Sequence, residues 1–272
     1  MKKKIKISDI FTGFCLVFFL LMFGFSLFHI IRWNIDAKKT NNEIDDLVNT
    51  TKVEKIKDNT NTEIIEQDNI SYSSPYWEYI KYDLINVNFN ELKQKNSETV
   101  AWIQVNGTNI NYPVVQASDN SWYLTHSYDG SYNEAGWVFM DYRNTLNEDK
   151  NTIIYAHARL DKTMFGSLRS VINDSWLSDS SNYVVKLSTP NENTLWQVFS
   201  VYRIPTTSDY ITTQFYSDEE FNNFTDMLIN RSVHNFDTTV NSSDRILTLS
   251  TCYNNYEKVV LHAKLIKREI RN

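Results

Sequence analysis

The chain has 272 residues, a formal net charge of −6 and a sequence pI of about 5.4. This acidic balance argues against a nucleic-acid-binding protein, which needs a basic face. Once the apolar and polar N-terminal segments are set aside, about 200 residues remain, and this length fits one globular domain.

The N-terminus predicts a membrane anchor. Residues 1–9 are rich in lysine, and residues 10–31 follow without any Asp, Glu, Lys or Arg. As a helix this run would be about 33 Å long, enough to cross a bilayer core of roughly 30 Å. A signal peptide is the alternative, but its apolar region is usually only about 7–15 residues and is followed by a small-residue cleavage site. We expect an uncleaved single-pass anchor in the cell membrane, with residues 1–9 as a cytoplasmic basic tip and the rest outside the cell.

Residues 32–71 are polar and charged, with scattered Ile, Leu and Val, and predict a stalk that is helical in part. We expect the globular domain to span residues 72–272. Its first segment, residues 73–96, has helical character in places.

The rest of the domain predicts a mainly β fold. Eight short runs are rich in β-branched and aromatic residues and are bounded by Asn, Asp, Gly, Ser or Pro. They are residues 99–107, 110–116, 136–142, 151–158, 182–189, 195–204, 245–252 and 258–266. One helix is expected over 217–233, where Ser217 and Glu220 form a capping box before a helical apolar pattern. Many short strands with a few helices indicate an antiparallel barrel or sandwich.

Cys252 is the one cysteine outside the apolar N-terminal run, because Cys15 lies within it. A lone extracellular thiol is buried and inert, pairs with another molecule, or acts as a nucleophile. Cys252 ends the strand "ILTLSTC" just before the polar turn "YNNYE". Reactive groups are often presented where a strand meets a loop, and this position favours the nucleophile.

A thiol nucleophile is usually activated by a nearby histidine. His157 follows the apolar strand "NTIIYA" and precedes a polar stretch, so it too lies at the end of a strand. His262 lies within a strand, while His126 and His234 have no evident role in catalysis. His157 is therefore the leading candidate base.

These residues carry a resemblance to a known family. "TLSTC" at 248–252 resembles the T-L-x-T-C signature of sortases, the membrane-anchored transpeptidases of Gram-positive bacteria. "NTIIYAHARLDKTMFGSL" is similar to the sortase histidine segment, and "GWVFMDYRN" to the segment before it in class B sortases. The late helix "SDEEFNNFTDMLI" is a further class B mark. The resemblance extends over about residues 72–268, and several motifs in order are more specific than one.

The resemblance implies an eight-stranded sortase β-barrel with peripheral helices and no cofactor. Cys252 would attack the bond after Thr in an N-P-x-T-x-like sorting motif, forming a thioacyl-enzyme with the substrate surface protein. An amine of the cell-wall precursor would then take the acyl group, with His157 as acid and base. Sortases also place an arginine early in the strand after the cysteine, and here that position holds Lys258. We expect Lys258 to act as a weaker oxyanion stabiliser, with Arg159 and Arg203 as more remote alternatives.

The same resemblance implies substrate contacts on three segments of the chain. The residues concerned are Ser250 and Thr251 beside the cysteine, Asn120 and Leu124 in "ASDNSWYL", and Thr207, Tyr210 and Ile211 in "TTSDYI".

Other function classes fit less well. A papain-like protease has its cysteine early and its histidine far downstream, the reverse of the order here. The sequence has no H-E-x-x-H or C-x-x-C motif that would indicate a metal enzyme. A non-catalytic surface-binding module and a pilus-assembling sortase remain as alternatives.

Overall fold

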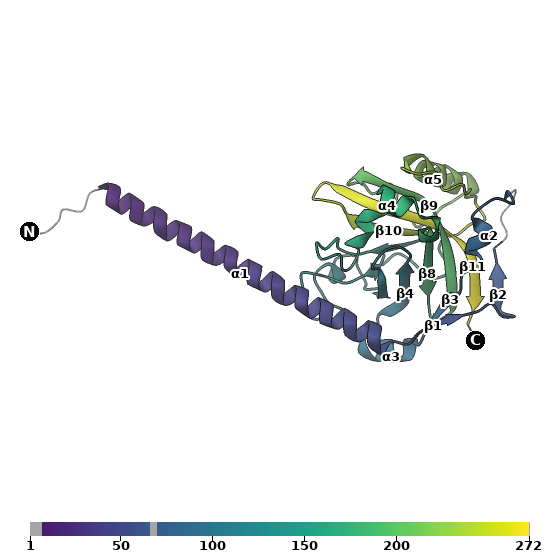
Figure 1. The fold of residues 1–272 in the computed structure, drawn as a ribbon, viewed down its shortest axis with the longest axis horizontal. Helices are drawn as coiled ribbons and strands as arrows, with labels where there is room; N and C mark the ends of the chain where they lie inside the picture. Colours follow the sequence, from purple (N-terminus) through teal and green to yellow (C-terminus); the bar gives the residue numbers. More distant parts are fainter. Residues whose placement is uncertain (1–6, 66–69, 272) are drawn as a thin grey trace, which may run out of the picture. The chain divides into compact units, whose positions relative to one another are not determined.

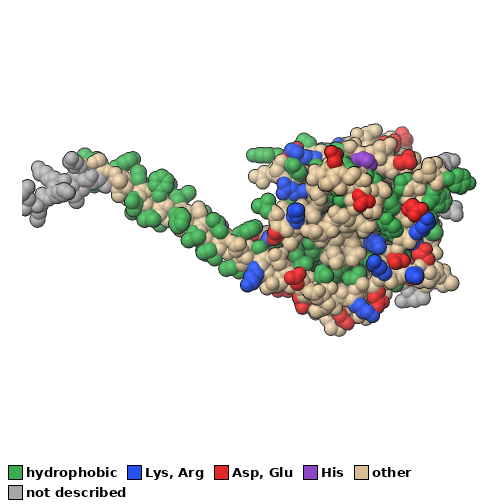
Figure 2. Space-filling view, viewed as in Figure 1, with side chains coloured by type: hydrophobic (Ala, Val, Ile, Leu, Met, Phe, Trp, Pro, Cys, Tyr) green, Lys and Arg blue, Asp and Glu red, His purple; other side chains and the backbone are tan. Residues whose placement is uncertain are grey.

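The computed structural model describes residues 7–65 and 70–271 and divides into two compact units, residues 1–42 and residues 43–272. The first helix, α1 (Ile7–Thr50), runs through the boundary between them (Figure 1). In the described part of the chain it is the one helix whose length and composition suit a membrane span. Apolar side chains cover its N-terminal half (Figure 2), and Phe14 and Leu21 are each 70% exposed. A helix that is apolar all round in this way is typical of a membrane-spanning segment.

The second unit is built on a closed sheet of eight strands, coloured from teal to yellow in Figure 1. They are β4 (Thr99–Val105), β5 (Asn111–Val115), β6 (Phe139–Met140), β7 (Asn151–Tyr155), β8 (Val184–Ser188), β9 (Glu192–Pro205), β10 (Ile246–Cys252) and β11 (Glu257–Ile270). Their order is β10-β7-β6-β5-β4-β8-β9-β11, and β11 pairs back onto β10. The predicted eight-stranded barrel is confirmed, and each of its strands falls on one of the eight runs identified in the sequence.

Two neighbouring pairs in the barrel are parallel, β10 with β7 and β5 with β6. The other pairs around the barrel are antiparallel. In the β7–β10 pair, Tyr155 lies opposite Ser250. Because parallel strands run in the same direction, the carboxyl ends of β7 and β10 lie together at one edge of the barrel.

The barrel is filled by large apolar side chains. Trp102, Trp137 and Trp196 are at most 1% exposed and belong to one apolar cluster with buried Val and Ile residues of the barrel strands. Each fully buried Val or Ile side chain of this cluster contributes roughly 1.5–3 kcal/mol to stability. The core thus fixes the strands whose ends carry the polar residues described below.

The helix α5 (Asp218–Arg231) packs on the outside of the barrel. Ser217 Oγ accepts a hydrogen bond from the backbone N–H of Glu220, so the predicted N-cap is confirmed. The Glu220 carboxylate accepts a hydrogen bond from the backbone of Tyr216 rather than that of Ser217. Phe221 and Leu228 on the inner face join a cluster with β9 and β11. Shorter helices are α2 (Tyr76–Tyr79), α3 (Phe89–Lys95), α4 (Asp174–Leu177) and the 3-10 turns Trp122–Leu124, Ser167–Ser170 and Ser180–Asn182.

The segment predicted as a stalk differs from expectation. The compact unit begins at Glu43 rather than at residue 72. Strand β1 (Val53–Ile56) pairs with β3 (Leu84–Val87), and β2 (Thr62–Ile64) pairs with the end of β11. β1 and β2 are short, at least half of their residues are polar, and partners far along the chain hold them in place. Local composition therefore gave no sign of them.

Candidate active site

Cys252 is the last residue of β10 and lies directly opposite Lys258 of β11. The hairpin between them is tight, because Tyr253 N–H donates to the carbonyl of Glu257 at 2.8 Å. Lys258 Nζ donates to Cys252 Sγ at 3.0 Å. The thiol is partly exposed. The thiol is therefore accessible and lies beside an ammonium group.

His157 lies two residues beyond the end of β7, the parallel neighbour of β10. Its Nε2 lies 2.8 Å from the carbonyl oxygen of Leu124, and a carbonyl can only accept, so Nε2 carries a proton. Gly136 permits this approach: its φ is +62°, and a Cβ there would lie 2.5 Å from Tyr123 O and 3.0 Å from His157 Cδ2. Only glycine fits both the backbone angle and the space.

Cys252, His157 and Lys258 line one cavity of about 400 Å³. The predicted substrate contacts Ser250, Thr251, Asn120, Leu124, Thr207, Tyr210 and Ile211 line it as well. Phe139, Tyr155 and Ala156 complete the lining. The structure therefore brings together all the site residues predicted from the sequence, although they come from five separate segments of the chain.

Hydrogen bonds from hydroxyl groups connect the segments that line this cavity. Tyr210 Oη lies 2.9 Å from Ser250 Oγ, and Thr251 Oγ1 donates to the carbonyl of Ala156 at 2.8 Å. Burial raises the pKa of Tyr210, so its phenol stays protonated at neutral pH. The first bond fixes the loop after β9 against β10, and the second fixes the end of β7 against β10.

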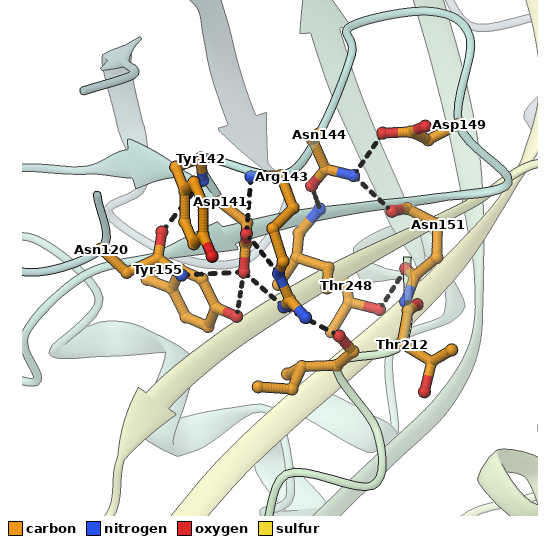
Figure 3. A network of polar contacts seen from close by, with 12 residues as sticks. Asn120, Asp141, Tyr142, Arg143, Asn144, Asp149, Asn151, Tyr155, Thr212 and Thr248 are labelled. Carbon is orange, nitrogen blue, oxygen red and sulfur yellow. Dashed lines mark hydrogen bonds and ion pairs between the residues drawn. The ribbon is translucent and has the colours of Figure 1, made fainter. Parts of the chain in front are cut away.

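A buried carboxylate holds two further walls of the cavity (Figure 3). Asp141 Oδ2 accepts hydrogen bonds from Asn120 Nδ2 at 3.0 Å, from Arg143 Nη2 at 2.7 Å and from Tyr155 Oη at 2.9 Å. Arg143 Nη2 also donates to the carbonyl of Ile211 at 3.0 Å. Burial would raise the pKa of Asp141, but these hydrogen bonds outweigh it and the pKa lies below its ordinary value. Asp141 and Arg143 therefore link three segments that line the cavity.

Two hydrogen bonds fix the side-chain amide of Asn120. Its Nδ2 binds Asp141, and its Oδ1 accepts from the backbone N–H of Tyr142 at 3.0 Å. One N–H and one lone pair of the amide are left for a ligand.

The alternative arginines are engaged elsewhere. The Arg203 guanidinium pairs with Glu257 and lies 4.0 Å from the centre of the Tyr253 ring. Arg159 pairs with Asp161 at 3.1 Å. Neither lines the cavity of Cys252.

Three residues of this site were not predicted from the sequence: Gly136, Asp141 and Arg143. All lie in or beside "GWVFMDYRN", a segment that was noted for its resemblance alone. The available signals were the glycine before a strand and the two opposite charges, two residues apart, after it. Their function depends on contacts with residues 120, 157 and 211, which the sequence does not bring together.

Comparisons with known proteins agree with this geometry. A family model described as "Sortase domain" matches residues 103–266. Sortase B of Staphylococcus aureus is 33% identical over 222 residues, which cover 80% of this chain and 88% of that protein. A crystal structure of sortase B from B. anthracis with the compound AAEK1 has a TM-score of 0.67 at 33% identity, covering 86% of this chain and 99% of that one. A Staphylococcus aureus sortase B–substrate complex has a TM-score of 0.62 at 36% identity, covering 66% of this chain and 84% of that one. With a cysteine and a histidine at adjacent strand ends of a matching barrel, the chain belongs to the sortase family as a class B cysteine transpeptidase.

Proposed function

We propose that this sortase cleaves a C-terminal N-P-x-T-x-like sorting motif after Thr and transfers the new acyl end to an amine of the cell-wall precursor. Cys252 Sγ attacks the Thr carbonyl carbon, the C–N bond breaks, and the tail leaves with its amine. The acceptor amine then attacks the thioester and releases Cys252. The observation that carries this proposal is the placement of Cys252, His157 and Lys258 on one cavity, with Lys258 Nζ 3.0 Å from the thiol.

His157 acts as the acid and base. Its Nε2–H is bound to the carbonyl of Leu124, so Nδ1 is the nitrogen that gains and loses a proton. In the first step the protonated ring gives its proton to the leaving amine, and in the second the neutral ring accepts one from the incoming amine.

Lys258 replaces the family's arginine as the cation beside the reacting carbon. Its ammonium group supplies positive charge to the thiolate and to the tetrahedral oxyanion, but not the bidentate fork of a guanidinium. The engagement of Arg203 by Glu257 and of Arg159 by Asp161 supports this assignment.

The sorting peptide occupies the cavity of Cys252. Leu124, Phe139 and Ile211 offer apolar surface to the aliphatic parts of the motif. Ser250, Thr251, Asn120, Thr207 and Tyr210 surround its polar backbone. Such a combination of apolar walls with a few fixed polar groups is typical of peptide and small-molecule sites.

The enzyme is anchored in the cell membrane by the apolar part of α1. The lysines of residues 1–9 keep the N-terminus in the cytoplasm, and the barrel lies outside the cell, where surface proteins with sorting signals arrive.

The test is turnover of a fluorogenic N-P-x-T-x peptide by the full chain in detergent micelles. Cys252→Ala is expected to abolish cleavage while the circular dichroism spectrum stays native. His157→Ala is expected to lower turnover by about 10²–10⁴-fold. The matched controls His126→Ala and His234→Ala are expected to stay near wild type. Turnover by the folded Cys252→Ala variant, or wild-type rates in His157→Ala, would overturn the assignment.

A further inference from the structure

A second cavity, of about 480 Å³, adjoins the same strand ends as the active site. Tyr253, which follows Cys252, lines it, and so does Arg159, two residues after His157. The remaining lining residues are Gly107, Thr108, Asn109, Leu160, Lys162, Gly166, Ser167, Arg169, Ser170 and Asn173. The two cavities are therefore lined by consecutive residues where β10 ends, Cys252 and Tyr253, and by His157 and Arg159 after β7.

The lining of this second cavity is basic. It contains Arg159, Lys162 and Arg169 and no Asp or Glu, although the whole chain carries a net charge of −6. Asp161 neutralises Arg159 at 3.1 Å. Among the described residues, Lys162 and Arg169 have no ion-pair partner. Two positive charges thus face this cavity without compensation from the protein.

Two of the three basic groups, Arg159 and Arg169, contact neighbouring side chains. Arg159 Nε donates to Thr163 Oγ1 at 3.0 Å, and Asp161 also binds Thr163. The loop packs so closely that a Cβ at Gly166 would lie 2.3 Å from the carbonyl oxygen of Arg159. The Arg169 guanidinium lies 5.1 Å from the centre of the Tyr253 ring. Groups ordered before binding lose little entropy when a ligand arrives.

We propose that this cavity binds an anionic group, a carboxylate or a phosphate, of the amine acceptor. The inference rests on the proposed function, in which two substrates meet at Cys252 in turn. The sorting peptide fills the first cavity, so the acceptor must reach the thioester from another direction. Arginine and lysine bind carboxylate and phosphate through charge-assisted hydrogen bonds. An acceptor held by its anionic group at Lys162 and Arg169 would present its amine toward Cys252 and His157.

Direct binding to the full chain in detergent micelles tests the site. The probes are triglycine, triglycinamide, which lacks the carboxylate, and diglycyl-aminoethyl phosphate, each titrated by ligand-observed NMR. Triglycine and the phosphate are expected to bind on the order of tenfold more tightly than the amide, and less so at high salt. The tighter of the two anionic probes identifies which anion the site prefers. Equal affinity for triglycine, its amide and the phosphate would overturn the proposal.

Removing the charges of Lys162 and Arg169 tests whether the preference for anionic probes arises in this cavity. The double variant Lys162→Gln/Arg169→Gln is expected to lose the preference for the anionic probes, and Lys162→Arg/Arg169→Lys to keep it. Lys93→Gln is the matched control, since Lys93 is an exposed lysine on α3, away from both cavities. A preference that survives in the double glutamine variant would place the anion elsewhere and overturn the proposal.

Kinetics separate this site from the proposed function. With a saturating sorting peptide, the double glutamine variant is expected to raise the apparent KM for triglycine on the order of tenfold. Its kcat/KM for peptide cleavage without added amine is expected to stay within about twofold of wild type, because neither Lys162 nor Arg169 lines the cavity of Cys252. Normal cleavage with an unchanged KM for triglycine would overturn the acceptor site alone. Absence of cleavage in the wild-type protein would overturn the proposed function and the acceptor role together.

Discussion

The pairing of Cys252 with Lys258 shows that a single residue determines which group lies beside the thiol. Both positions are fixed by the β10–β11 register, so any side chain at 258 faces the thiol. The departure from the family's arginine was visible in the sequence, and the structure places the lysine 3.0 Å from Sγ. The surroundings of the Cys252 thiol therefore follow from one cross-strand pair.

Lys258→Ala is expected to lower kcat/KM for the sorting peptide by about 10–100-fold, because the oxyanion loses its nearest cation. Lys258→Arg should keep or raise activity, since the guanidinium adds a second donor. Arg203→Ala and Arg159→Ala serve as controls and are expected to change peptide cleavage far less. If Lys258→Ala turns over like wild type while one arginine variant is dead, the role belongs to that arginine.

At the scale of elements, the active site depends on ties between loops and strands. Asp141 follows β6, Tyr155 ends β7, and Ile211 lies in the loop between β9 and α5. The Asp141–Arg143 pair connects them (Figure 3). This pair thereby holds the loop between β9 and α5, a kind of segment that is usually mobile, in a fixed position relative to the ends of β6 and β7.

Asp141→Asn is expected to weaken binding of the sorting peptide more than the chemical step. The amide cannot form the charge-assisted pair with Arg143, so the Asn120 and Ile211 walls lose a shared anchor. We expect KM to rise several-fold, with kcat changed less, as when binding interactions shared by ground and transition states are lost. Asp149→Asn is the control, because Asp149 belongs to the Asn144 branch of the network and does not line the cavity. A fall in kcat with unchanged KM would argue against a positioning role.

A second tie links β10, β11 and β9 through a buried histidine. His262 is fully buried, with Nδ1 2.9 Å from Thr248 Oγ1 and Nε2 2.8 Å from Tyr202 Oη. Burial, with a smaller contribution from the positive charge of Arg231, lowers the pKa of His262 to about 3. The imidazole therefore stays neutral in the folded protein at pH values where it would be protonated in the unfolded chain.

The stability of the domain is expected to fall as the pH decreases below about 6.5, where the unfolded chain takes up a proton that the folded His262 refuses. Lowering the pH from 7 to 5 should cost about 2 kcal/mol through this group. His262→Gln removes the titration, so its free energy of unfolding should depend less steeply on pH. Urea unfolding at pH 5, 6 and 7 measures the difference, and any constant offset reports lost packing. Parallel pH profiles for the two proteins would show that His262 is not the source.

At the scale of the whole molecule, the sequence predicted the barrel and a set of residues that line one cavity, but not the strands before residue 72. The eight barrel strands alternate or run apolar over several residues, and this local pattern is sufficient to find them. β1, β2 and β3 have only three or four residues each, and their existence depends on pairing with distant segments. The same holds for Asp141 and Gly136, whose roles arise from contacts across the fold. Local sequence patterns thus identified the barrel strands. They missed the short strands and the single residues whose roles depend on long-range contacts.

The N-terminal boundary leads to a prediction about truncation. Lys267 is fully buried, and its Nζ donates to Asp58 Oδ1 at 2.7 Å and to the carbonyl of Ile80 at 2.7 Å. A chain beginning at residue 72 lacks Asp58, β1, β2 and the buried Leu47, and it leaves the Lys267 charge without its partner. Because the Asp58 side chain is itself 48% exposed, loss of this partner should cost less than the roughly 3–5 kcal/mol of a fully buried pair. Together with the lost packing, Tm should fall by about 5 °C or more relative to a chain beginning at Glu43.

Differential scanning calorimetry of the 43–272 and 72–272 chains measures this difference. Asp58→Asn in the longer chain isolates the ion pair, and Lys52→Gln, which removes an exposed partner of Glu54, is the matched control with little expected effect. If both truncated chains melt at the same temperature, residues 43–71 are dispensable and the domain begins where its sequence composition changes. A large loss from Asp58→Asn alone would show that the buried Lys267 charge, rather than the added strands, makes this segment part of the enzyme's folded unit.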